Sequence, residues 1–161
     1  VEYFRANAHR LQLGNLGFEL YKKDGALANP SDIKNIKQTL NVWTGEIESY
    51  FEIEGTPVTV LTASHQEKDE IGVKVKSDLL QQKRLKISLR IPFPTGDWAD
   101  MGTKWEGKQD YKSTLVEKSK TEAVVTHVMD SISYNVNFSW KGNAKIKKLY
   151  SNKKLLEGVT Q

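Results

Sequence analysis

Apolar and polar residues alternate along most of this chain, and the alternation decides which folds are open to it. The clearest example is TLNVWTGEIESYFEIEGTPVTVLTAS, residues 39–64, where hydrophobic side chains recur at every second position with a few local slips. A β-strand points successive side chains to opposite faces, so a period of two gives one apolar and one polar face. We therefore expect half-buried strands here.

Further stretches with the same period follow, and residues typical of turns separate them. The stretches are IGVKVKS (71–77), LKISLRI (85–91), TEAVVTHVM (121–129) and SISYNVNFSW (131–140). Turn residues occur at Thr44-Gly45 and at Gly55-Thr56-Pro57. Short strands at this spacing are typical of an all-β, antiparallel β-sandwich. No repeat or linker interrupts residues 1–161, so we predict one β-sandwich domain.

The same pattern assigns two tryptophans and one short helix. Trp43 and Trp140 fall within the alternation, and we expect both to lie in the core. The last stretch predicts a core strand because it places five apolar side chains on one face: Ile132, Tyr134, Val136, Phe138 and Trp140. SDIKNIKQTL, residues 31–40, begins with a capping-type Ser31-Asp32 and leaves room for a helix of one or two turns.

Composition excludes several kinds of chemistry. The chain has no cysteine, which rules out disulfides, thiolate metal sites and thiol catalysis. His9, His65 and His127 lack the close spacing of zinc ligands, so we predict no metal and no cofactor. His127 lies in a predicted strand and is expected to be hydrogen-bonded packing. The net charge of +4 comes almost entirely from lysine, which is typical of a solvated surface and predicts no nucleic-acid partner. No apolar run reaches the roughly 20 residues that cross a bilayer, so no membrane partner is expected.

One segment departs from the alternation. From Pro92 to about Ser113 the period of two stops, and PTGDWADMGTKWEGKQDY, Pro94–Tyr111, carries two tryptophans and three aspartates. Loops of this length inside a compact domain are usually functional or disordered. Large aromatic side chains argue against disorder. We therefore treat this loop as the candidate functional segment.

Three interpretations of the Pro94–Tyr111 loop stay open. Sugars stack on aromatic rings and donate hydroxyl hydrogen bonds to carboxylates, so the loop suits carbohydrate. The carbohydrate-contact candidates are Asp97, Trp98, Asp100 and Trp105. Asp97 and Asp100 could instead be a glycosidase pair, with Glu106 and Asp110 behind them, but nothing nearby predicts the raised pKa that a general acid requires. The third interpretation is that both tryptophans pack the loop onto the sandwich. We predict no catalytic residue in this chain.

Several segments, taken in order, carry a resemblance to a known family. They are FRANAHRLQLGNLGFEL (4–20), IKQTLNVWTGEIESYFEIEGTPVTVLTASHQEKDEIGVKVKS (36–77), LKISLRIPFPTG (85–96) and VVTHVMDSISYNVNFSW (124–140). The chain resembles the N-terminal β-sandwich domain of bacterial glycosidases and phosphorylases with a six-hairpin α/α toroid, of the maltose- and kojibiose-phosphorylase kind. The resemblance covers about 130 of the 161 residues.

This resemblance implies a super-sandwich that docks on the helical toroid of the same parent chain and supports dimer contacts. In that family the catalytic residues lie in the toroid, so none is carried over to this chain. Val1 stands where a full-length protein would begin with Met, and we expect the chain to be a segment of a longer enzyme. Related bacterial glycosidases are commonly exported, which implies a periplasmic or secreted parent.

The expected function is therefore a non-catalytic N-terminal accessory domain of a glycoside hydrolase or phosphorylase, which lends a loop to the substrate cleft. Two alternatives stay open: an autonomous, lectin-like carbohydrate-binding module, and a structural or adhesion β-sandwich. The expected partners are the toroid, carbohydrate and a second copy of the chain. The sugar, the linkage and the choice between hydrolysis and phosphorolysis stay undecided.

Overall fold

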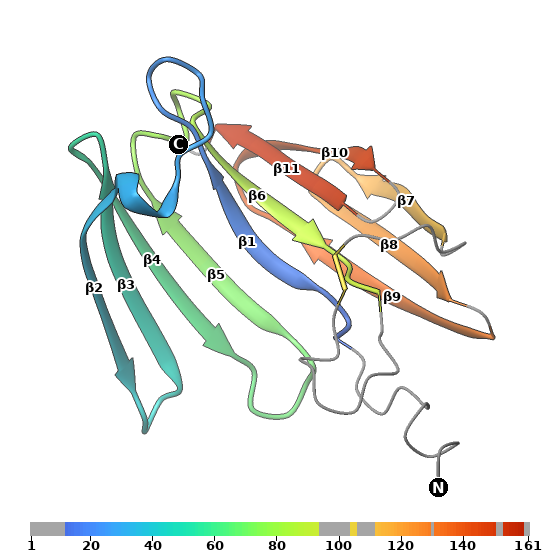
Figure 1. Cartoon of the computed structure of the whole chain (residues 1–161). Coiled ribbons are helices and arrows are strands. Elements are labelled where there is room, and N and C mark those ends of the chain that lie inside the picture. Colours follow the sequence, from blue (N-terminus) through green and yellow to red (C-terminus); the bar gives the residue numbers. More distant parts are fainter. Residues whose placement is uncertain (1–11, 94–103, 106–111, 130, 151–152, 160–161) are drawn as a thin grey trace, which may run out of the picture. The chain divides into compact units, whose positions relative to one another are not determined.

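The computed structural model describes residues 12–93, 104–105, 112–129, 131–150 and 153–159 (Figure 1). All but one of the described elements are strands. They are β1 (Asn15–Leu20), β2 (Ile33–Asn41), β3 (Glu46–Ile53), β4 (Thr56–Ser64), β5 (Ile71–Lys76), β6 (Leu85–Arg90), β7 (Lys112–Ser119), β8 (Glu122–Met129), β9 (Ile132–Ser139), β10 (Asn143–Tyr150) and β11 (Lys153–Val159). The exception is a single 3-10 turn, η1 (Pro30–Asp32). The predicted fold class, all-β and antiparallel of the β-sandwich type, is confirmed.

The described strands form three sheets. Their orders are β2-β3-β4-β5, β7-β8-β9 and β1-β6-β11-β10. The chain divides into two compact units, one built around Ile87–Glu157 and the other around Glu19–Lys86. The β2–β5 sheet belongs to the second unit and the β7–β9 sheet to the first, so each unit has a sheet and a core of its own.

Local turn chemistry sets the register of the β2–β5 sheet. Glu54 and Gly55 form a two-residue turn between β3 and β4, with φ angles of 47° and 77°, and Ile53 pairs with Thr56 across it. Both central residues have positive φ, as in the turn that best matches the twist of a hairpin. This geometry suits glycine but is uncommon for glutamate, so Glu54 is held against its backbone preference.

The segment expected to form a short helix is mostly strand. The capping-type residues do start a turn, in which Asp32 Oδ2 accepts a hydrogen bond from the Asn29 N–H at 2.8 Å, but the helix ends after η1. Residues 33–41 then pair with β3 as β2. A β-bulge shifts the register of this pairing between Lys34 and Lys37. Cross-strand pairing thus outweighs the weak helical signal.

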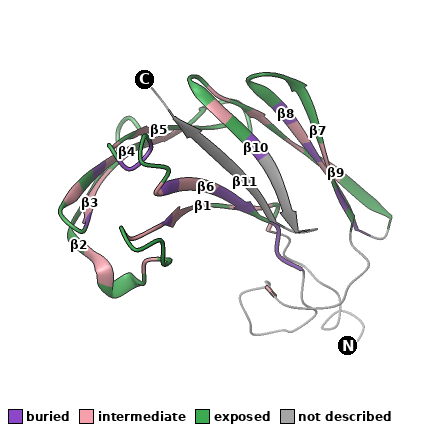
Figure 2. Ribbon diagram, turned by 90° about the horizontal axis from the view of Figure 1, so that it is seen from above, coloured by how far each residue is buried: buried purple, intermediate pink, exposed green. Residues whose placement is uncertain are grey.

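The two units bury separate apolar clusters. In the second unit Ile53, Val58 and Leu79 are completely buried, and Leu85 is nearly so. In the first unit Leu89, Ile91 and Val125 form a cluster, onto which four partly buried side chains pack: Leu115, Tyr134, Val136 and Phe138. Figure 2 shows buried segments of β6 and β8 among exposed strand residues. The prediction of a core face on β9 is thus confirmed for its three central members.

The prediction for Trp43 is wrong. Its side chain is 96% exposed, because β2 ends at Asn41 and Trp43 lies in the turn before β3. Trp140 is partly buried, and its Nε1 donates to the Ala144 carbonyl at 3.3 Å. Ile132, at the start of β9, is also exposed, contrary to expectation. Ile132 is the first residue of β9, whereas Trp43 and Trp140 lie just beyond the ends of β2 and β9.

Two isoleucines of the β2–β5 sheet provide a matched test of this core. We expect Ile53→Ala to lower the free energy of unfolding by about 2–5 kcal/mol, because it leaves a cavity at a fully buried position. Ile36→Ala, at a side chain that is 69% exposed, should change it by about 0.5 kcal/mol or less. Urea unfolding measures both values, and equal losses would contradict the assignment of the core.

Candidate functional site

The described part of the candidate loop is its base. Phe93 and Lys104 form an antiparallel bridge, in which each backbone N–H donates to the other residue's carbonyl at 2.8 Å. Phe93 itself is buried. The bridge holds the two chain ends that flank residues 94–103 beside one another. The segment between them is therefore closed at its base by two hydrogen bonds.

Trp105 lies directly after this bridge and contacts Arg90. The guanidinium carbon of Arg90, the last residue of β6, sits 4.3 Å from the centroid of the indole ring. A cation over an aromatic face at this distance contributes about 0.5–1 kcal/mol at an exposed site. Trp105 is partly buried. A sugar that stacked on the same side of the indole would have to displace Arg90.

Only one of the four carbohydrate-contact candidates lies in the described part of the chain. Trp105 is placed at the base of the loop, as above. Asp97, Trp98 and Asp100 lie outside the described residues, as do Glu106 and Asp110. The sequence predicted a sugar or the core as the partner of Trp105, and it gave no signal for Arg90, a cation from the preceding strand.

A polar row crosses the β7–β9 sheet inside the first unit. Ser113, His127 and Tyr134 are cross-strand partners and therefore share one face. Ser113 Oγ lies 2.7 Å from His127 Nδ1, and the Tyr134 hydroxyl donates to the Leu13 carbonyl at 2.8 Å. The rings of His127 and Tyr134 are 5.3 Å apart and tilted by 57°. Burial raises the pKa of Tyr134 above its ordinary value.

The contact between Ser113 and His127 has the length expected of a nucleophile and its base. Both side chains are buried, however, so no substrate can reach the serine oxygen without opening the core. The row is better explained as a hydrogen-bonded part of the packing, because buried polar groups need partners. This agrees with the prediction made for His127.

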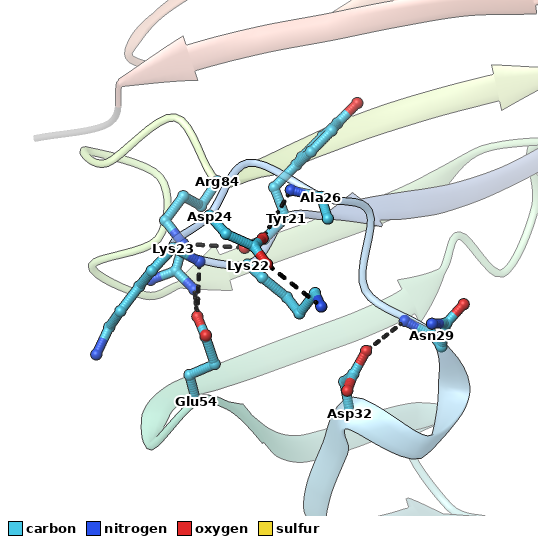
Figure 3. Close-up of polar contacts among 9 residues, drawn as sticks. All are labelled: Tyr21, Lys22, Lys23, Asp24, Ala26, Asn29, Asp32, Glu54 and Arg84. Carbon is cyan, nitrogen blue, oxygen red and sulfur yellow. Dashed lines mark hydrogen bonds and ion pairs between the residues drawn. The ribbon is translucent and has the colours of Figure 1, made fainter.

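A second polar network ties the second unit together (Figure 3). The Glu54 carboxylate forms an ion pair with Arg84 and accepts a hydrogen bond from the Lys23 N–H at 2.8 Å. Arg84 Nε also donates to the Tyr21 carbonyl at 2.9 Å. Arg84 is mostly buried, which weakens the screening of its charge by water. The network therefore joins the β3–β4 turn to the segment that precedes β2 in the chain and to the segment that follows β5.

The neighbouring turn holds a carboxylate, Asp24, whose pKa is shifted in the opposite direction to that of a general acid. Asp24 Oδ1 accepts a hydrogen bond from the Ala26 N–H at 2.8 Å, and Lys22 Nζ lies 3.6 Å from Oδ2. The backbone hydrogen bond and, to a lesser extent, the lysine charge lower the pKa of Asp24. A general acid requires a raised pKa, so Asp24 is a turn-stabilising residue.

The described part of the chain also bears on two other kinds of function, metal binding and membrane spanning. No group of three or more potential metal-binding side chains occurs in that part of the chain. None of its helices is long and apolar enough to cross a membrane. No protein-family model matches the chain, and neither the curated proteins nor the solved structures contain a significant match.

The Glu54–Arg84 pair gives a prediction for stability. We expect Glu54→Gln to lower the free energy of unfolding by about 1–3 kcal/mol, because the mostly buried Arg84 loses its counter-charge while the turn keeps its length. Glu48→Gln, at an exposed glutamate of β3, should have an effect of about 0.5 kcal/mol or less. Chemical unfolding of both variants is the measurement, and a silent Glu54→Gln would refute the role of the pair.

Proposed function

We propose that this chain is a non-catalytic accessory domain of a carbohydrate-active enzyme, a glycoside hydrolase or phosphorylase. It docks on a helical catalytic domain of the same parent protein and lends the Pro94–Tyr111 loop to the substrate cleft. The resemblance of its ordered segments to the N-terminal domain of such enzymes supports this proposal, as does the all-β fold with antiparallel sheets.

The closed base of the loop is the observation that carries the proposal. The Phe93–Lys104 bridge and the contact of Arg90 with Trp105 anchor the loop on both sides of residues 94–103. Anchoring a loop at both ends lowers the conformational entropy lost when it binds a ligand. A short segment with Asp97, Trp98 and Asp100 between such anchors is suited to form one wall of a sugar site.

The surroundings of Trp105 favour an accessory role over an autonomous lectin-like module. An autonomous module needs an aromatic face open to the sugar, whereas Arg90 covers one side of this indole. A loop that forms only one wall of a sugar site needs fewer exposed aromatic faces, because the catalytic domain supplies the other contacts to the sugar. A structural or adhesion role needs no sugar contact from the loop at all.

The parent enzyme provides the first test. Trp98→Ala and Trp105→Ala should each raise KM for the glycoside about tenfold or more, the loss expected for one aromatic stacking contact. The midpoint of thermal unfolding should stay nearly unchanged for Trp98→Ala. Trp140→Phe, at a partly buried tryptophan after β9, is the matched control and should leave KM unaltered. Unaltered KM in both loop variants would retire the proposed role of the loop.

A titration of the chain without its parent separates the accessory role from the lectin-like module. We expect no saturable change in tryptophan fluorescence when maltose, kojibiose or longer oligosaccharides are added at millimolar concentration. Saturable binding at that concentration would instead identify an autonomous carbohydrate-binding module.

A further inference from the structure

Strand β5 is the last strand of the β2–β5 sheet, and its outer edge is open. The sheet order places β4 on one side of β5, and within the described residues no strand pairs with its other side. Five of its six residues are exposed, and the remaining one, Val75, is partly buried. Its pairing with β4 runs from Ile71 to Lys76 without a shift in register. A regular, exposed edge of this kind offers a row of backbone donors and acceptors to another strand.

The hydrogen bonds of the β4–β5 hairpin identify the backbone groups that point to the open edge. The His65 N–H donates to the Glu70 carbonyl at 2.8 Å, so these two residues form a hydrogen-bonded pair at the start of the ladder. Hydrogen-bonded and non-hydrogen-bonded pairs alternate along an antiparallel ladder. The even-numbered residues of β5 therefore bond to β4. The backbone groups that point outward belong to three apolar residues: Ile71, Val73 and Val75.

The neighbouring hairpin gives the same assignment. The two-residue turn between β3 and β4 makes Ile53 and Thr56 a hydrogen-bonded pair. The even-numbered residues of β4 therefore bond to β3, and its odd-numbered residues bond to β5. Each odd-numbered residue of β4 is the partner of an even-numbered residue of β5. Both hairpins thus direct the same three residues of β5 to the open edge.

The backbone of β5 fits a second copy of itself in an antiparallel register. When Val73 lies opposite Val73 of the second copy, Ile71 lies opposite Val75 of that copy, and the reverse pair follows by two-fold symmetry. All three pairs join outward-pointing residues, and each pair can exchange two backbone hydrogen bonds. Their side chains also share one face, so apolar groups meet apolar groups across the joint.

The charges favour the same register. It places Lys76 opposite Glu70 of the second copy, and Lys74 opposite Gly72. A shift of two residues in one direction would place Lys74 opposite its own copy, and in the other direction Lys76 opposite Lys68. Like charges directly opposite one another destabilise a strand pair. Only the register centred on Val73 gives each lysine of β5 an acidic partner or a glycine.

The other edge of the sheet is less suited to pairing. Strand β2 has a bulge between Lys34 and Lys37, and Asn35 within it has a φ of 52°. Bulges interrupt the row of outward-pointing groups and protect natural sheet edges from association. Strand β5 has neither a bulge nor a proline. The two edges of the sheet therefore differ in the feature that controls pairing.

We propose that β5 is a dimerisation edge, through which two copies of this chain pair in antiparallel register about a two-fold axis at Val73. The pairing joins two four-stranded sheets into one continuous sheet. Backbone bonds alone would accept many extended segments, and the pattern of charges is what favours a second copy. Because the contact takes only one short strand from each copy, the dimer is weak and reversible. The proposal does not depend on the enzymatic role proposed above.

A charge swap tests the register. Sedimentation equilibrium of the chain from about 10 μM to 1 mM measures the Kd of the dimer. Lys76→Glu and Glu70→Lys each place like charges opposite one another at both ends of the contact, and each should raise Kd about tenfold or more. The double variant Lys76→Glu/Glu70→Lys restores both ion pairs and should return Kd to within about threefold of the wild-type value.

Gly72 offers a second test, with two variants at one position. A Cβ added to Gly72 would lie 4.0 Å from the Ala63 carbonyl oxygen, an ordinary contact, so a single copy accommodates a side chain there. In the dimer that side chain would face Lys74 of the second copy. The Kd of Gly72→Lys should therefore exceed that of Gly72→Glu about tenfold or more, although both add a long side chain.

Amide hydrogen exchange locates the contact. Raising the protein concentration should slow exchange at the Val73 amide, which points to the open edge, and leave the Lys74 amide, which bonds to β4, unaltered. A chain that stays monomeric up to about 1 mM would overturn the proposal. So would a dimer whose Kd is the same in every charge variant, because another surface would then hold the two copies.

Discussion

The register of β3 between β2 and β4 is the constraint on which the second unit depends. Because side chains alternate between faces, a slip by one residue would move Glu48 and Glu52 to the apolar face and Ile53 to the charged one. The two-residue turn at Glu54-Gly55 prevents this slip, although its positive φ disfavours glutamate. The ion pair with Arg84 offsets that local cost, because the turn places the Glu54 carboxylate beside the Arg84 guanidinium. Local strain and tertiary charge pairing thus select the same register.

In the first unit, too, cross-strand partners share a face, but here the packed side chains include a polar row. Its three-stranded sheet puts Val125, Val136 and Phe138 against Leu89 and Ile91, and one polar row passes through this packing. In that row Ser113 hydrogen-bonds to His127 Nδ1, the His127 ring contacts the Tyr134 ring, and the Tyr134 hydroxyl donates to the Leu13 carbonyl. The Arg90–Trp105 contact at the base of the loop follows directly from β6, the strand that supplies Leu89. The candidate sugar-contact loop is therefore attached to a strand that also contributes to a packed core.

Much of the fold could be predicted from the sequence, because alternation over residues 46–64 and 121–139 reports which residues of a strand share a face. The prediction of a buried side chain failed for Trp43, which lies beyond the end of β2. Trp43 lies next to the alternating Leu40 and Val42 but one position out of phase with them, and Thr44-Gly45 already marks a turn. A turn residue need not follow the face of the strand before it. For the candidate site, composition identified the loop but not the Arg90 partner of Trp105. That contact joins residues 15 positions apart through the Phe93–Lys104 bridge, and no local pattern encodes such a bridge.

An accessory domain of this kind would act by surfaces and not by reacting groups. Its candidate sugar contacts lie on a loop with a closed base, and the β5 edge of its β2–β5 sheet is open to another strand. A structure of the full parent protein with a bound oligosaccharide tests this account most directly. The account predicts that the two carboxylates flanking the scissile bond come from outside this chain. Asp97 and Asp100 on either side of that bond would contradict it.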